Sequence, residues 1–139
     1  MDELLFKNKQ LIVDTINGDC FRACLTSLLG IPNSPNLPNG GIDWFLNWDR
    51  FFRNYGLSLK FNQKACWKEG FWIASVPSKN FEGITHAIIM RDQEVYFDPS
   101  LKETYTVGEN LLGKELVQGG WSLEVTNLQK VYKLKNYKG

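Results

Sequence analysis

Two mainly apolar runs in the middle of the chain constrain its fold most. Residues 71–76 and 85–90 carry few polar side chains, and runs of this length are typical of strands that lie inside a sheet. A short polar turn separates the second run from residues 95–97, so we expect these two segments to form an antiparallel hairpin that ends at Asp98. The sequence therefore predicts a sheet with the two runs in its interior.

Two helices are expected before these strands. In residues 19–29, apolar side chains recur three and four positions apart, which is the pattern of a helix that packs on one face, and Gly30 ends it. Asp19 stands at the N-cap position, where its carboxylate would accept hydrogen bonds from the first free amides. The second predicted helix covers residues 43–55, and its many aromatic side chains indicate that it is mostly buried.

The remaining segments complete an α+β pattern. Apolar residues alternate with polar ones in residues 57–62 and 121–125, which indicates two half-buried strands. Residues 1–9 are read as a short helix or a loose arm, and residues 33–41, rich in Pro, Asn and Gly, as a loop. Because helices come first and strands follow, we expect one layered α+β domain over residues 1–139.

Composition and charge narrow the possible functions. Hydrophobic residues make up 43% of the chain, which is enough to form a core. With 16 Lys and Arg against 15 Asp and Glu, the net charge is +1, so we expect neither nucleic acid nor an anionic membrane as a partner. No membrane span or export signal is recognisable, and three cysteines cannot all pair. These features predict reduced thiols and a cytoplasmic protein.

Three residues have the chemistry of a catalytic triad. His86, the only histidine, begins one predicted strand, and Asp98 ends the next one, so a hairpin would bring the two side chains together. The carboxylate can then hold one ring nitrogen as a donor and leave the other as a base. Cys20 lies in the first turn of the first helix, where free amides and the helix dipole favour a thiolate. The chain order fits a nucleophile, a general base and an orienting acid.

Four short segments surround these residues: NGDCFRACL at 17–25, LLGIP at 28–32, THAII at 85–89 and FDPS at 97–100. They resemble the motifs of papain-like cysteine peptidases. The nearest likeness is to the bacteriocin-processing branch and to small bacterial and phage proteins with a GDCxRAC helix. The resemblance implies a papain-like fold in which a central helix carries Cys20 and packs on an antiparallel sheet, with His86 and Asp98 on adjacent strands. It also implies a hydrolase of peptide, isopeptide or other amide bonds that needs no cofactor.

One position departs from the pattern of that superfamily. Many members carry a Gln about six residues before the Cys, and its side-chain amide helps the Cys backbone amide to bind the oxyanion. Here Asp14 holds that position, and an ionised carboxylate cannot donate. We expect either Asn17 or Gln10 to supply the amide, or the second donor to be absent.

Other roles are open for the same residues. Cys20 could be an ordinary buried thiol and His86 a core histidine. Cys24 lies one turn after Cys20 on the apolar face and is predicted to belong to the core, while Cys66 has polar neighbours and no expected role. Cys20, Cys24, His86 and Asp98 could instead bind zinc, although structural zinc sites usually use cysteine knuckles on turns.

The sequence also leaves the partner and the reaction type open. Trp44 and Trp48, beside the loop at 33–41, could line a substrate cleft for a peptide or protein substrate. Transglutaminase-like and acyltransferase-like relatives use the same three catalytic residue types, so acyl transfer is an alternative to hydrolysis. A non-catalytic module that holds a partner protein in its groove is the alternative from another class, and Asp14 favours it.

Overall fold

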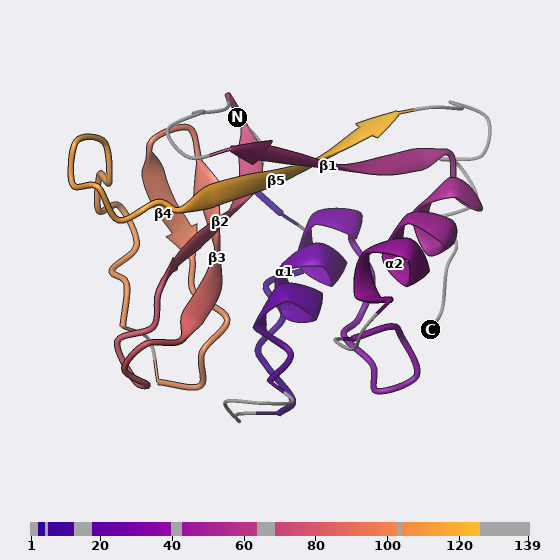
Figure 1. Ribbon diagram of the computed structural model, residues 1–139, viewed down its shortest axis with the longest axis horizontal. Helices are drawn as coiled ribbons and strands as arrows, with labels where there is room; N and C mark the ends of the chain where they lie inside the picture. Colours follow the sequence, from indigo (N-terminus) through magenta and orange to yellow (C-terminus); the bar gives the residue numbers. More distant parts are fainter. Residues whose placement is uncertain are drawn as a thin grey trace.

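The computed structural model describes residues 3, 4, 6–12, 18–39, 43–63, 69–102 and 104–125. Within these residues the elements are α1 (Cys20–Leu29), α2 (Trp44–Arg53), β1 (Leu57–Gln63), β2 (Phe71–Pro77), β3 (Thr85–Arg91), β4 (Glu94–Phe97) and β5 (Gly119–Val125). The strands form one antiparallel sheet in the order β1-β5-β2-β3-β4, and both helices lie on one face of it (Figure 1). The predicted α+β class is confirmed.

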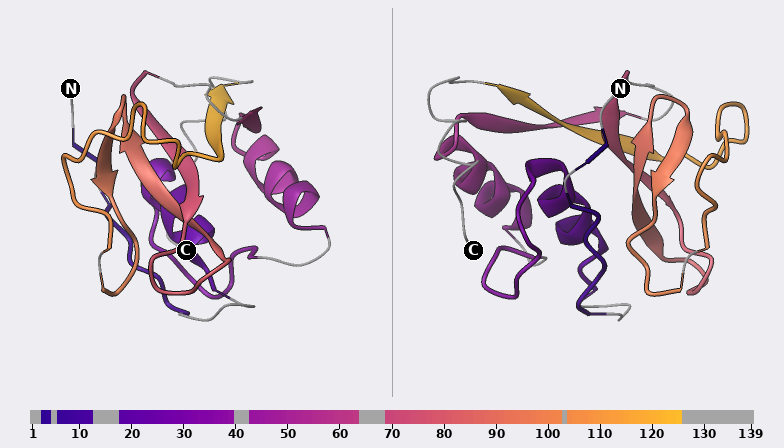
Figure 2. Two further views of the ribbon diagram at one scale, coloured as in Figure 1. Left: turned by 60° about the vertical axis from the view of Figure 1, so that its left-hand side comes forward. Right: turned by 180° about the vertical axis from the view of Figure 1, so that it is seen from behind.

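The central strands β2 and β3 are covered on both faces, as their apolar runs predict. Ile73 and Ile89 face the helices and join a core cluster with α1 and α2. Trp72 and Ile88 point to the other face, where the chain between β4 and β5 covers them through side chains such as Tyr105. Figure 2 shows the helices and this connecting segment on opposite sides of the sheet. Period-two alternation of side chains therefore fills two apolar layers from one pair of strands.

The hairpin of β3 and β4 has the predicted position. Ile89 pairs with Phe97 and Arg91 pairs with Glu94, with a register shift between Ile89 and Met90. The turn between the strands uses Asp92 in the left-handed region, at φ 55°, which Asp adopts more readily than most residues. As a result, the start of β3 and the end of β4 lie side by side at the open end of the hairpin, opposite the turn.

The two ends of α1 follow different rules. At its C-terminus, Gly30 takes φ 75°, and the amides of Gly30 and Ile31 donate to carbonyls of the last turn, as predicted for a glycine cap. At the N-terminus the prediction was wrong, because the Asp19 side chain makes no cap hydrogen bond. Its carboxylate instead accepts from the backbone amides of Leu11 and Ile12.

A buried ion pair explains why Asp19 turns away from the helix. Arg22, one turn later, donates to Asp19 Oδ2 at 2.9 Å, and both side chains are almost fully buried. The amide of Asn33 donates to the same oxygen at 3.0 Å. A buried carboxylate is stabilised by such a set of charged and neutral donors. The first-turn amides of α1 are thus left without a side-chain cap.

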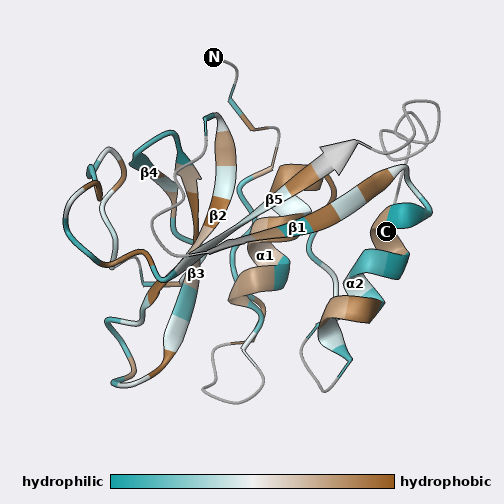
Figure 3. Cartoon of the chain, turned by 45° about the horizontal axis from the view of Figure 1, so that its top comes forward, coloured by the Kyte–Doolittle hydropathy of each residue, from teal (hydrophilic) through white to brown (hydrophobic). Residues whose placement is uncertain are grey.

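The predicted burial of α2 was also wrong. Only Trp48 and Phe52 of this helix are buried, while Phe45 is 38% and Leu46 58% exposed. The helix packs mainly on β1, an edge strand of the sheet, so one face meets the core. Accordingly, α2 carries both hydrophobic and strongly hydrophilic residues (Figure 3).

The described residues near the N-terminus form neither helix nor strand. They run between α1 and the segment that follows β4, with Asn8 donating to Ser27 and Ile31 and Gln10 donating its backbone amide to Pro99. No helix in the part of the chain that the structure describes is long and apolar enough to cross a membrane.

Candidate active site

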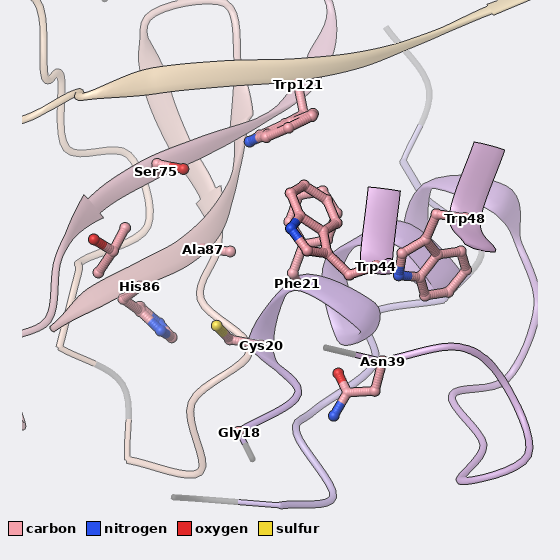
Figure 4. A pocket seen from close by; sticks show the side chains of 11 residues that line it. Gly18, Cys20, Phe21, Asn39, Trp44, Trp48, Ser75, His86, Ala87 and Trp121 are labelled. Carbon is pink, nitrogen blue, oxygen red and sulfur yellow. The ribbon is translucent and has the colours of Figure 1, made fainter. Parts of the chain in front are cut away.

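A cavity of about 300 Å³ opens at the N-terminus of α1, between this helix, α2 and the helix-covered face of the sheet. It is lined by Gly18, Cys20, Phe21, Asn39, Trp44, Trp48, Ser75, Thr85, His86, Ala87 and Trp121 (Figure 4). Trp44 and Trp48, which the sequence suggested for a cleft, therefore lie in the same cavity as Cys20 and His86.

His86 and Asp98 meet at the open end of the hairpin formed by β3 and β4. The Nε2 atom of His86 lies 2.7 Å from Asp98 Oδ1 and 2.9 Å from Ser100 Oγ. Because an ionised carboxylate can only accept, Nε2 carries a proton and donates it to Asp98. The ring's other nitrogen is then available on the side of Cys20, and the two side chains point toward one another in Figure 4.

Asp98 is held as an anion by its surroundings. Its side chain is fully buried, and its carboxylate also accepts from the backbone amides of Ser100, Thr104 and Tyr105. Burial alone would raise the pKa of Asp98, but the hydrogen bonds from His86 and from the backbone outweigh burial and hold the pKa well below its usual value. A permanent negative charge therefore faces the imidazole.

The charge on Asp98 governs the protonation of His86. Burial would lower the pKa of His86, whereas the hydrogen bond with Asp98 and the interaction with the Cys20 side chain raise it, and the net result is a pKa of about 9. At neutral pH the ring is consequently an imidazolium. A neighbouring imidazolium and a helix N-terminus are the two features that generally favour the reactive thiolate form of a cysteine.

The two described thiols occupy different surroundings. Cys20 is half-buried at the first position of α1 and lines the cavity. Cys24, one turn later, is fully buried in the core, and burial raises its pKa well above the usual value. The sequence-based prediction that Cys24 belongs to the core is confirmed. Cys66 lies outside the described residues.

The segment that carries Asp98 is attached to the N-terminal residues. Lys9 Nζ donates to the carbonyl oxygens of Asp98 and Ser100 at 3.2 and 2.9 Å. Next to it, the backbone amide of Gln10 donates to Pro99 at 2.9 Å. These contacts join the N-terminal segment to the residues that follow β4, and they hold the turn that carries Asp98 in place.

The sequence predicted that Asn17 or Gln10 supplies a side-chain amide for the oxyanion, or that this donor is absent. Asn17 and Asp14 lie outside the described residues. Gln10 donates its side-chain amide to the carbonyl of Ile12 and does not line the cavity. Asn39, which the sequence reasoning did not single out, lines the cavity on the side of Cys20 away from His86 (Figure 4). Only its place in a Pro-, Asn- and Gly-rich loop could have hinted at it.

The zinc alternative has no support in the described part of the chain. No group of three or more His, Cys, Asp or Glu side chains there has an arrangement that could hold a metal ion. Cys24 points into the core, away from the cavity that Cys20 lines.

Comparison of the chain with models of protein families, with curated proteins and with solved structures gave no match.

Proposed function

We propose that this protein is a papain-like cysteine hydrolase that cleaves a peptide, isopeptide or other amide bond through Cys20, His86 and Asp98. The observation that carries the proposal is a single imidazole between two partners. One ring nitrogen of His86 bonds to a buried carboxylate at 2.7 Å, and the ring also interacts with Cys20 at the mouth of a cavity. This is the arrangement that activates a thiol for acyl transfer.

The first half of the reaction begins at the Cys20 sulfur. Its thiolate attacks the carbonyl carbon of the amide and forms a C–S bond, while the carbonyl oxygen takes up negative charge. The C–N bond then breaks, and the imidazolium of His86 gives its proton to the departing nitrogen. An amine leaves, and the acyl group is held on Cys20 as a thioester.

The second half releases the acyl group. Neutral His86 takes a proton from a water molecule, and the water oxygen attacks the thioester carbon. The C–S bond breaks, the carboxylic acid departs, and the thiolate and imidazolium are restored. Asp98 does not exchange a proton in these steps, and its role is to orient the ring and to stabilise its charge.

Two groups are suited to bind the oxyanion. The backbone amide of Cys20 belongs to the uncapped first turn of α1, where the helix dipole also favours negative charge. Asn39 lines the same cavity and offers a side-chain amide as the second donor. Preorganised donors of this kind typically contribute about 10² to 10³ in rate each.

The test is the reactivity of the thiols followed by acylation. Iodoacetamide at neutral pH, with mapping by mass spectrometry, is expected to modify Cys20 much faster than Cys24, whose thiol is fully buried. The activated ester p-nitrophenyl acetate should then acylate Cys20 and turn over, and Cys20→Ala should abolish this. Equally slow alkylation of all cysteines would contradict the proposal and favour a binding module.

The oxyanion assignment has its own test. Asn39→Ala is expected to lower the rate of ester turnover by about 10²-fold and to leave alkylation of Cys20 unchanged, because alkylation forms no tetrahedral oxyanion. Asn36→Ala, an exposed amide in the same loop, serves as the matched control. Unchanged turnover in Asn39→Ala would remove this residue from the mechanism.

A further inference from the structure

Three aromatic rings form the wall of the cavity that lies opposite His86. Phe21, Trp44 and Trp121 contact one another edge to face, with ring centroids 5.2 to 5.6 Å apart. They come from α1, α2 and β5, so three separate elements converge on one apolar wall. Edge-to-face packing in a closed triangle gives this wall a defined shape.

Small side chains keep the cavity open in front of that wall. Ser75 on β2 and Ala87 on β3 are paired across the two strands, and both line the cavity. On the same face of these strands the next positions are Ile73 and Ile89, which are fully buried in the core. The cavity therefore lies where two large side chains of the sheet give way to two small ones.

The lining is almost free of charge. Among the described residues that line the cavity, only Cys20 and His86 can titrate, and the others are aromatic, small or neutral polar. A carboxylate placed against three aromatic rings would lose part of its hydration and meet the negative faces of the rings without a cation beside it, which is unfavourable. The rings are not closed off as a core would be, because Phe21, Trp44 and Trp121 are all partly exposed.

We propose that this cavity is a subsite for one uncharged aromatic or large aliphatic group next to the bond that Cys20 attacks. This inference rests on the proposed function and names its substrate class: an amide that carries such a group and no carboxylate at that position. A volume of about 300 Å³ is at the lower end of ligand sites, which suits a single side chain. The cavity begins at Cys20 and His86 and extends to Trp121 (Figure 4).

The experiment compares two alkylating probes with the same reactive group. Iodoacetamide reports the reactivity of Cys20 alone, whereas N-benzyl iodoacetamide adds a neutral aromatic ring. Each rate is divided by the rate of the same probe with free glutathione. We expect the benzyl probe to label Cys20 at least about tenfold faster on this scale, which corresponds to about 1.4 kcal/mol of binding, and its rate to saturate with concentration.

Variants assign this preference to the cavity. Trp44→Ala removes part of the wall and Ser75→Leu fills the space, so each is expected to abolish the preference, which is the ratio of the two probe rates in the same variant. Leu112→Ala removes an exposed apolar side chain that does not line the cavity and should keep the preference. Unfolding midpoints identify any variant that fails to fold, and two independent variants keep the test decisive.

The outcomes separate the subsite from the catalytic proposal. Fast labelling of Cys20 by iodoacetamide with no benzyl preference would overturn the subsite alone. A preference that survives in folded Trp44→Ala and Ser75→Leu, or one equally strong for a 4-carboxybenzyl probe, would overturn it as well. If iodoacetamide labels Cys20 only slowly, the catalytic proposal fails. Binding of unreactive N-benzylacetamide, followed by tryptophan fluorescence and lost in Trp44→Ala, would still support the subsite.

Discussion

The protonation of His86 is the property of the site that can be measured most directly. Because the chain has one histidine, a proton NMR titration shows a single pair of imidazole ring signals. Asp98 and Cys20 raise the pKa of this ring to about 9 from the usual 6.5, against the effect of burial. We therefore expect a midpoint well above 6.5 in the native protein.

Two variants divide the effect between the partners of the ring. Asp98→Asn removes the negative charge that raises the pKa of His86 most, so the midpoint should fall well below about 9. Cys20→Ala should lower the pKa by less, because the hydrogen bond with Asp98 is kept. Asp49→Asn changes a carboxylate on α2 that pairs with Arg53 and should leave the titration unchanged.

The same pKa predicts how stability changes with pH. The folded pKa of His86 is higher than the unfolded one, so its contribution is fully present below pH 6.5 and is lost as pH rises toward 9. At about 1.4 kcal/mol per pKa unit, the loss is about 3 kcal/mol. Urea unfolding at both ends of this window, in native protein and His86→Gln, isolates the contribution. A native midpoint at or below 6.5, or equal pH dependence in both proteins, would refute the reasoning.

The other predictions concern the described thiols and the buried ion pair. Cys20→Ala should abolish ester turnover and leave the fold intact, while Cys24→Ala, in the core, should cost about 1 kcal/mol of stability and keep the activity of the folded molecules. Turnover and urea unfolding of both variants would expose a reversed assignment. Asp19→Ala leaves Arg22 as an unpaired buried charge and should cost about 3 to 5 kcal/mol. The control Asp49→Ala, which breaks a pair with an exposed partner, should cost less than about 1 kcal/mol, and equal losses would contradict the role of burial.

Local sequence patterns were sufficient to predict the hairpin and the contact between His86 and Asp98. Period and turn chemistry depend on neighbouring residues, so the apolar runs of β2 and β3 and the cap at Gly30 could be read directly from the sequence. His86 and Asp98 meet for the same reason, since a hairpin joins them with a short turn. That contact needs no knowledge of the rest of the fold.

Predictions that depended on competition between partners were less successful. Asp19 has the residue type and position of an N-cap. Its carboxylate can, however, accept hydrogen bonds from other donors that the fold brings near it, and these compete with the first-turn amides. Arg22, Asn33 and the amides of the N-terminal segment are such donors, and they bind the carboxylate instead. The prediction that α2 is mostly buried was wrong for a similar reason, because the aromatic content of a helix does not determine how many other elements pack around it.

The sequence by itself determined the α+β class, the central strands, and the chemical types of Cys20, His86 and Asp98. Only the tertiary structure decided that α1 packs on β2 and β3, which brings Cys20 to His86 from a distant part of the chain. It also decided that Asn39 and three aromatic rings from separate elements share one cavity with them. Contacts of this kind depend on how several elements pack at once, and the free energy of such packing is not written in any local pattern.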